Sequence, residues 1–173
     1  MTPTTSERIL ELREIVRNAP EATSEAARRV MVANRRRDSR PELELRRAVH
    51  RCGLRFRVDL AIHVPDRRPI RPDIVFTRRR VAVFVDGCFW HGCVAHGTQP
   101  RSNSTYWAAK IEVNQARDRD QAAALERQGW AVLRVWEHEP TPAAVSRIAE
   151  AVSQAATWSG GRASAGINAA ATA

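Results

Sequence analysis

Three acidic residues and one histidine have the types and positions that metal-dependent hydrolysis needs. Asp73 opens a short apolar segment, Asp86 closes the next one, and Glu42 stands at the start of an expected helix before both. Carboxylates gathered at strand ends suit Mg²⁺, which takes few protein oxygens and keeps several waters. Such an ion can activate water and neutralise the charge of a phosphodiester. His91 is then the candidate general base or acid for the attacking water.

A purely structural explanation of the same four residues stays open. The run Ser39-Arg40-Pro41-Glu42 is a typical helix start, so Glu42 also fits a capping box. Asp73 could cap a turn, Asp86 could simply end a strand, and His91 could be incidental. Spacing alone does not decide between these explanations.

Two cysteines and two histidines form a second candidate site. Cys88, Cys93 and His96 lie within nine positions, and His138 follows the last apolar segment. A Cys₂His₂ set is a common structural zinc site, and here it would tie a loop to the end of the sheet. Partly buried thiols with surface histidines are another explanation. A catalytic cysteine is less well supported, because no base pairs obviously with either thiol.

Phe89 and Trp90 lie between the two sites, in a loop flanked by glycines. They could belong to the core. They could also form a wedge that unstacks base pairs, which needs large flat apolar groups beside a basic surface. Met31 lies among the arginines of segment 25–37. It could insert between base pairs in the same way, or it could be a buried methionine on a helix whose basic face is solvated.

The composition favours a polyanionic partner. The 173 residues carry a net charge of +9, and the pI is about 11.1, which is typical of nucleic-acid-binding proteins. Nearly all of this charge is arginine, which a genome rich in G and C would also produce. No apolar run of about 18 residues and no signal-type N-terminus is present, so we expect a cytoplasmic protein without a membrane span. Its three cysteines then fit thiols or metal ligands better than disulfides.

The hydrophobic pattern predicts the elements that position these groups. Strands are expected over residues 54–62, 71–76, 81–85 and 130–136, and the basic turn 78–80 makes a hairpin of the middle two. That hairpin brings Asp73 and Asp86 close enough to share a cation. Helices are expected over residues 6–17, 25–37, 40–52, 105–128 and 140–154. Cys52 falls on the apolar face of the third helix, so we expect a core thiol.

The order of these elements predicts one α/β domain with a mixed sheet flanked by helices, whose last strand arrives through a helical crossover. Residues 1–22 are then an N-terminal extension with a short helix, and residues 23–154 form the domain. Residues 155–173, rich in Ala, Ser, Gly and Thr, are expected to be a disordered tail.

Short motifs run in one order along about residues 24 to 139. The longest is Phe84-Val85-Asp86-Gly87-Cys88-Phe89-Trp90-His91-Gly92-Cys93. The others are Met31 with 35–39 and 41–43, Arg71-Pro72-Asp73, Asn103, Trp107, Lys110-Ile111, Asn114, Arg117-Asp118, Gly129-Trp130 and Val135-Trp136-Glu137. Together they resemble the very short patch repair (Vsr) family of mismatch endonucleases, and several motifs in one order are more specific than any single motif.

The resemblance implies a restriction-endonuclease-like fold and an enzyme that nicks double-stranded DNA beside the T of a T:G mismatch, which arises when 5-methylcytosine deaminates. It implies that Asp73 and the carbonyl of Val85 bind Mg²⁺. His91 is then the general base, and Glu42 acts through bound water.

The resemblance also implies a wedge and a zinc site. The implied intercalating residues are Met31, Phe89 and Trp90, and the implied zinc ligands are Cys88, Cys93 and His138, with His96 as the fourth. The chain departs from the family at two positions: Asp86 stands where histidine is common and could be a metal ligand, and His138 stands where cysteine is frequent.

We therefore expect a Mg²⁺-dependent, zinc-containing endonuclease for DNA repair. It would act as a monomer on duplex DNA with a T:G mismatch, with other mismatch-repair proteins as further partners. Two alternatives stay open. One is a site-specific restriction-type nuclease on the same fold, and the other is a zinc-stabilised DNA-binding module without activity.

Overall fold

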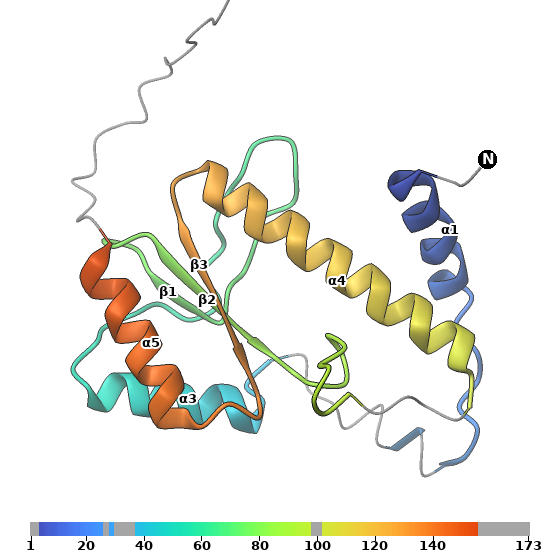
Figure 1. Ribbon diagram of the computed structural model, residues 1–173, viewed down its shortest axis with the longest axis horizontal. Helices are drawn as coiled ribbons and strands as arrows, with labels where there is room; N and C mark the ends of the chain where they lie inside the picture. The colour runs from blue at the N-terminus through green and yellow to red at the C-terminus, as the bar shows by residue number, and fades with distance from the viewer. Residues whose placement is uncertain (1–3, 26–27, 30–36, 98–101, 156–173) are drawn as a thin grey trace, which may run out of the picture.

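The computed structural model describes residues 4–25, 28–29, 37–97 and 102–155 (Figure 1). In chain order, the helices and strands within these ranges are α1 (Thr5–Arg17), α3 (Arg40–Arg51), β1 (Ile74–Phe76), β2 (Val81–Asp86), α4 (Ser104–Arg127), β3 (Ala131–Trp136) and α5 (Thr141–Gln154).

β2 is the central strand of a three-stranded sheet. β1 pairs with it antiparallel, with Ile74 opposite Val83. β3 pairs with it parallel, from Val81 opposite Ala131 onward. α4 lies between β2 and β3 in the chain and provides the crossover that two parallel strands need. The mixed sheet, its hairpin and its crossover are thus as the sequence predicts.

Side chains alternate along β2 and so reach both faces of the sheet. Val81 and Val83 join a buried cluster with residues of α3 and α5. Ala82 and Phe84 join a second cluster that includes Leu125 of α4. The sheet is therefore a middle layer, with α3 and α5 on one face and α4 on the other (Figure 1).

The predicted N-terminal helix is present as α1. Thr4 and Glu7 form a capping box at its start. α1 packs against α4 (Figure 1), and Arg8 Nε donates to Glu112 Oε1 at 2.7 Å. α1 is thereby fixed to the crossover helix.

The strand predicted over residues 54–62 is wrong. This segment forms only two isolated bridges, from Arg57 to Val75 and from Ile62 to Ile70. Asp59 lies between them with a φ of 51°, which an extended strand cannot contain. The alternating pattern therefore belongs to a loop that touches the edge of the sheet at two points.

The prediction that Cys52 is a core thiol is also wrong, because Cys52 is exposed. α3 ends at Arg51, and Cys52 is its C-cap. Gly53 follows with a φ of 80° and turns the chain away from the helix axis. Helical spacing aligned Cys52 with buried Leu45 and Val49, but the helix stops one residue too early.

Two predictions concern residues that the structure does not describe. Met31 and most of the helix expected over residues 25–37 lie outside the described residues, as does the tail from residue 156. The boundaries drawn at residues 22 and 154 stay predictions.

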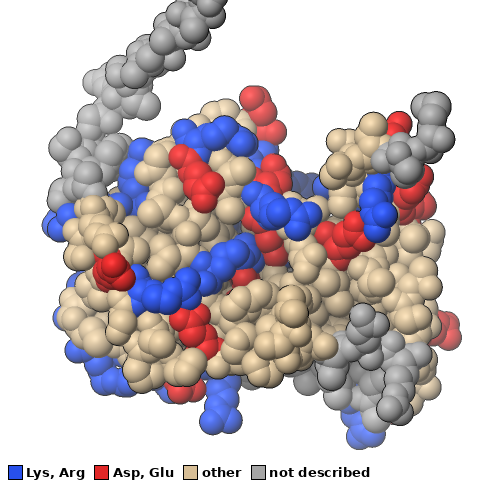
Figure 2. All heavy atoms as spheres, in the orientation of Figure 1, with Lys and Arg blue, Asp and Glu red and all other residues tan. Residues whose placement is uncertain are grey.

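Basic and acidic side chains are interspersed on the face that Figure 2 shows. This face is thus not uniformly positive, although the net charge of the chain is +9. Among the described helices, none combines the length and apolar character that crossing a membrane requires.

Candidate active site and metal centre

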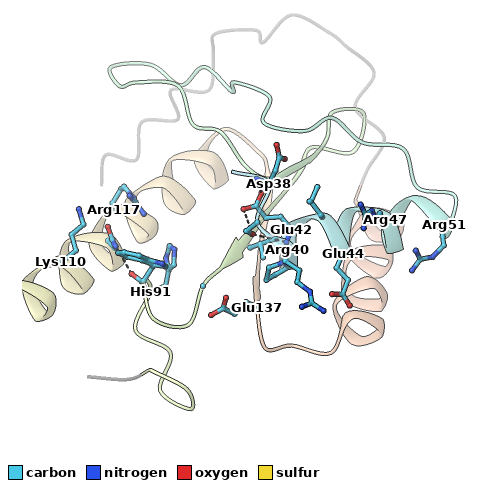
Figure 3. A pocket seen from close by; sticks show the side chains of 17 residues that line it. Asp38, Arg40, Glu42, Glu44, Arg47, Arg51, His91, Lys110, Arg117 and Glu137 are labelled. Atoms are coloured by element: carbon cyan, nitrogen blue, oxygen red, sulfur yellow. Dashed lines mark hydrogen bonds between the residues drawn. The ribbon is translucent and has the colours of Figure 1, made fainter. Parts of the chain in front are cut away.

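The carboxyl end of β2 opens into a cleft of about 1320 Å³. One wall is α3, and the other is the middle of α4 (Figure 3). The loop after β2 contributes Gly87, Trp90 and His91 to the lining. Of the predicted catalytic residues, Glu42 and His91 therefore line one cleft; Asp73 and Asp86 do not line it but lie next to the lining residue Val85.

Asp73 lies directly before β1, at the level of the end of β2. Its N–H donates to the carbonyl of Val83 at 3.0 Å, and its Oδ2 accepts from the Val85 N–H at 2.7 Å. Burial raises the pKa of Asp73 to about 6, and the nearby charges of Glu42 and Asp86 act in the same direction, against the Val85 hydrogen bond. The structure thus places a carboxylate where its own negative charge is poorly compensated.

Glu42 is in the first turn of α3, and 7% of it is exposed. Its carboxylate accepts from the Asp38 N–H at 3.0 Å, from Ser39 Oγ at 2.9 Å and from Arg46 Nη2 at 2.9 Å. Glu42 therefore stabilises the start of α3, but through the Asp38 N–H and the Ser39 hydroxyl and not through the Ser39 N–H of a capping box; the same side chain also lies within electrostatic reach of Asp73. The two explanations are compatible.

Asp86 is the last residue of β2 and is bound to Arg134. Arg134 Nε and Nη2 donate to the two oxygens of Asp86 at 2.5 Å each. Arg134 Nη2 also lies 3.2 Å from Asp118 Oδ2. In this structure the cation that Asp86 holds is thus the guanidinium of its β3 neighbour.

His91 is oriented by an acidic residue of α4. His91 Nδ1 lies 2.5 Å from Asp118 Oδ2 and 3.7 Å from Asp86 Oδ1. Burial alone would raise the pKa of Asp118, but the hydrogen bond with His91 and the charges of Arg134 and Arg117 outweigh it and lower that pKa. Asp118 is therefore ionised at neutral pH, so it can accept a hydrogen bond from an Nδ1–H of His91, and in that tautomer the imidazole has Nε2 as its basic nitrogen.

Asp118 and Arg134 were not predicted as site residues. Asp118 sits in the polar middle of α4, where a carboxylate between arginines is typical of a solvated face, yet it is 8% exposed. Arg134 interrupts the apolar strand β3. A charged residue in such a strand was the available signal, because it needs a buried partner.

α4 also fixes the backbone of the loop that carries His91. Asn114 Nδ2 donates to the Trp90 carbonyl at 2.9 Å, and Gln115 Nε2 donates to the His91 carbonyl at 3.0 Å. Gly92 has a φ of 65°, and a Cβ there would lie 2.7 Å from atoms of Gln115 and Ile111. Glycine at this position therefore allows the loop to approach the helix closely.

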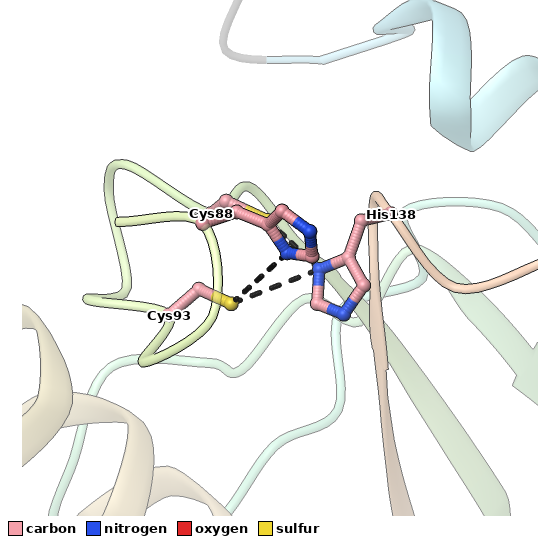
Figure 4. A group of neighbouring side chains, drawn as sticks. Cys88, Cys93 and His138 are labelled. Atoms are coloured by element: carbon pink, nitrogen blue, oxygen red, sulfur yellow. Dashed lines mark hydrogen bonds between the residues drawn. The ribbon is translucent and has the colours of Figure 1, made fainter. Parts of the chain in front are cut away.

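The predicted zinc ligands come together where the loop after β2 meets the residues that follow β3 (Figure 4). The ligand atoms of Cys88, Cys93, His96 and His138 all lie within 4.8 Å of one another. His138 Nδ1 is 3.0 Å from Cys88 Sγ and 3.7 Å from Cys93 Sγ. In a tetrahedral zinc site with ordinary bond lengths, neighbouring ligand atoms are about 3.3–3.8 Å apart. The four side chains therefore fit one such ion.

An aromatic cluster lies beside the cleft. The ring centroid of Phe89 is 5.0 Å from that of Trp90 and 5.1 Å from that of Trp107, and all three contacts in the trio are edge-on. Each ring is half-buried. Phe89 and Trp90 are thus parts of a packed group that keeps exposed surface.

Comparison with known proteins points to one family. A family model described as DNA mismatch endonuclease Vsr matches residues 21–96. This segment contains both cysteines of the metal-binding group, the three candidate carboxylates and His91.

Individual relatives extend the similarity beyond that segment. The type II nicking enzyme V.NaeI of Lentzea aerocolonigenes is 48% identical over 122 residues, which are 70% of this chain and 74% of the relative. V.XorIIP of Xanthomonas oryzae pv. oryzae, also a type II nicking enzyme, is 44% identical over 66% of this chain and 82% of the relative. The DNA mismatch endonuclease Vsr of Escherichia coli (strain K12) is 38% identical over 103 residues, which are 58% of this chain and 62% of the relative.

Proposed function

The chain belongs to the Vsr family of DNA mismatch endonucleases and is a DNA endonuclease; from this premise we propose that it is a Mg²⁺-dependent enzyme that nicks duplex DNA beside the T of a T:G mismatch. One observation carries the proposal: a single cleft is lined by an oriented histidine base, by the buried carboxylate of Glu42 and by Trp90 of an aromatic cluster, and Asp73 is hydrogen-bonded to the N–H of Val85, which also lines it. The restriction-endonuclease-like fold is part of the same proposal, supported by a mixed sheet between helical layers.

Asp73 and the carbonyl of Val85 would hold the Mg²⁺, and Glu42 would act through bound water. The raised pKa of Asp73 supports this assignment, because a buried carboxylate near other carboxylates is short of positive charge. When bound, the ion supplies charge neutralisation at the phosphodiester and lowers the pKa of water.

The chain's own contribution to the reaction is the base. His91 donates Nδ1–H to Asp118 and presents Nε2 for the proton of the attacking water. Arg134 neutralises Asp86 and lies against Asp118, so both acidic neighbours keep His91 in place while part of their charge is compensated.

We assign Cys88, Cys93, His96 and His138 to one structural zinc ion. Elemental analysis of the purified protein should find about one zinc per chain, as a single four-ligand site holds. Cys88→Ser should lower this value to near zero and destabilise the protein, whereas Cys52→Ser should leave it unchanged, because Cys52 is exposed and outside the set. A fully folded wild-type protein without zinc would contradict the assignment.

We assign Phe89 and Trp90 to reading the mispair by insertion into the base stack. Trp90→Ala should reduce the preference for mismatched over matched duplex about 10- to 100-fold, since opening a base step costs a few kcal/mol. Trp90→Phe, which keeps a flat ring, should retain most of the preference. The measurement is the ratio of nicking rates on the two duplexes together with the affinity for each. Equal loss of affinity on both duplexes would show that Trp90 is a packing residue.

A restriction-type nuclease on the same fold is the main alternative, and strand labelling separates the two. With each strand of a T:G duplex labelled in turn, we expect cleavage of the T-containing strand alone. Cleavage of both strands at a fixed sequence, with or without the mismatch, would favour the restriction-type activity. Specific binding with no cleavage in Mg²⁺ would favour a binding module.

A further inference from the structure

We propose that the exposed face of α3 binds the phosphate backbone of duplex DNA outside the catalytic centre. The surface consists of Arg40, Arg47 and Arg51, which we call the arginine stripe. That its polyanion is duplex DNA rests on the proposed function, whereas the surface itself is defined by geometry and charge.

The stripe follows from helical spacing. Arg40, Arg47 and Arg51 lie within about 40° of one another around the axis of α3, because an α-helix has about 3.6 residues per turn. Val49, which is fully buried, lies about 180° away from them. All three arginines line the cleft, and Figure 3 shows them along the α3 wall. The helix therefore presents one face to the core and one basic face to the cleft.

The fourth arginine of α3, Arg46, has a structural role, unlike the three arginines of the stripe. Arg46 is 8% exposed and is paired with Glu42 at 2.9 Å and with Asp38 at 2.5 Å. The stripe arginines are exposed and, within the described part of the chain, form no ion pair. Their charge is thus not consumed inside the protein.

Acidic residues do not cancel the stripe. Glu44 shares its face, but it is one carboxylate among three guanidinium groups, and it accepts a hydrogen bond from Thr141 Oγ1 at 3.3 Å. The facing wall adds Lys110 and Arg117 of α4 (Figure 3). Both walls of the cleft therefore carry positive charge, although Arg117 is paired with Asp118 at 3.0 Å and the lining also includes Asp38, Glu42 and Glu137.

The dimensions suit a phosphate backbone. Arg40 and Arg51 are about 17 Å apart along the helix axis at about 1.5 Å per residue. Phosphates of one strand follow one another at about 3.4 Å along the axis of the duplex, so the stripe can follow about five of them. Contacts from arginine to phosphates fix the position of the duplex but carry no sequence information.

The test is the salt dependence of binding to a T:G duplex and to its matched control, measured on the full chain without added Mg²⁺. The variant is the triple change Arg40→Gln, Arg47→Gln and Arg51→Gln. We expect it to weaken binding about 10- to 100-fold on both duplexes alike and to lower the slope of log K against log salt by about 2 to 3, because each phosphate contact contributes about 0.9. Replacing the same three residues by lysine should restore most of the slope.

Arg78→Gln is the matched control. Arg78 is exposed, as are the stripe residues, but it lies in the turn before β2, at the end of the strand opposite the cleft. It should change neither affinity nor slope. An unchanged slope in the triple variant, or a loss confined to the mismatched duplex, would overturn the inference. If the wild-type protein does not nick a T:G duplex but the triple variant still has a lower slope than the wild type, the inference about the arginine stripe stands and the proposed function is wrong.

Discussion

Replacing Asp73 by asparagine is expected to lower nicking by about 10³-fold or more, while leaving DNA affinity largely intact. The reason is the loss of several kcal/mol of charge stabilisation that a bound Mg²⁺ supplies. Asparagine keeps the shape of the side chain and an oxygen that can accept the Val85 N–H. The measurement is single-turnover nicking of a T:G duplex with saturating enzyme.

The same substitution should make the protein more stable in the absence of Mg²⁺. The pKa of Asp73 is raised by burial from 3.8 to about 6. Between these two pH values the folded protein holds a proton that the unfolded chain has lost, so the free energy of unfolding falls as pH rises and stays lower above pH 6. This cost is on the order of 3 kcal/mol, and asparagine does not incur it.

Thermal melts at two pH values isolate the effect. At pH 8, Asp73→Asn should melt several degrees above the wild type, and the gap should shrink toward pH 4. Added Mg²⁺ should stabilise the wild type but not the variant. Asp66→Asn, an exposed turn residue, is the control and should change neither activity nor the pH dependence. An Asp73→Asn protein that nicks normally would exclude Asp73 from the metal site.

The second large effect concerns His91 and Asp118. His91→Ala should reduce the nicking rate about 10²- to 10⁴-fold, the usual contribution of a general base. Asp118→Asn alone should reduce the nicking rate about tenfold or more, because it removes the negative charge that orients His91. The distance from His91 Nδ1 to Asp118 Oδ2 is 2.5 Å. In the His91→Ala background, Asp118→Asn should cost little more, because Asp118 acts through the imidazole.

Asp120→Asn is the control for this cycle. Asp120 lies on the same helix, is exposed and pairs with Arg67 at 3.0 Å, so it should leave the rate unchanged. If the losses from His91→Ala and Asp118→Asn simply multiply, Asp118 acts independently of His91, and the proposed pairing is wrong.

Local patterns predicted most of the scaffold, because they report burial directly. The hydrophobic periods located β2, β3 and the helices that cover them, and Ser39 with Pro41 placed the start of α3 correctly. The segment 54–62 failed because alternation reports which side chains are half-buried, not whether the backbone is extended, and Asp59 breaks the extension. The predicted end of α3 was wrong at Cys52 for a similar reason, because the spacing of apolar residues continues past the last helical residue, Arg51.

The grouping of the two cysteines and two histidines was predictable because three of them lie close together in the sequence and the parallel pairing of β2 with β3 brings His138 to the loop. The partners of His91 and Asp86 were not. Asp118 is 27 residues from His91, and Arg134 is 48 from Asp86, so their pairing depends on how α4 and β3 pack. Long-range pairing of charged side chains leaves no periodic trace in a single sequence.

The central claim, a mismatch-dependent nick, is tested most directly by comparing a T:G duplex with the same duplex in which the T is paired with A, each with and without Mg²⁺. The proposal predicts a single cut beside the T of the mismatched strand in Mg²⁺, a matched duplex that stays essentially intact, and no cutting of either without the ion. Equal cutting of both duplexes would contradict it.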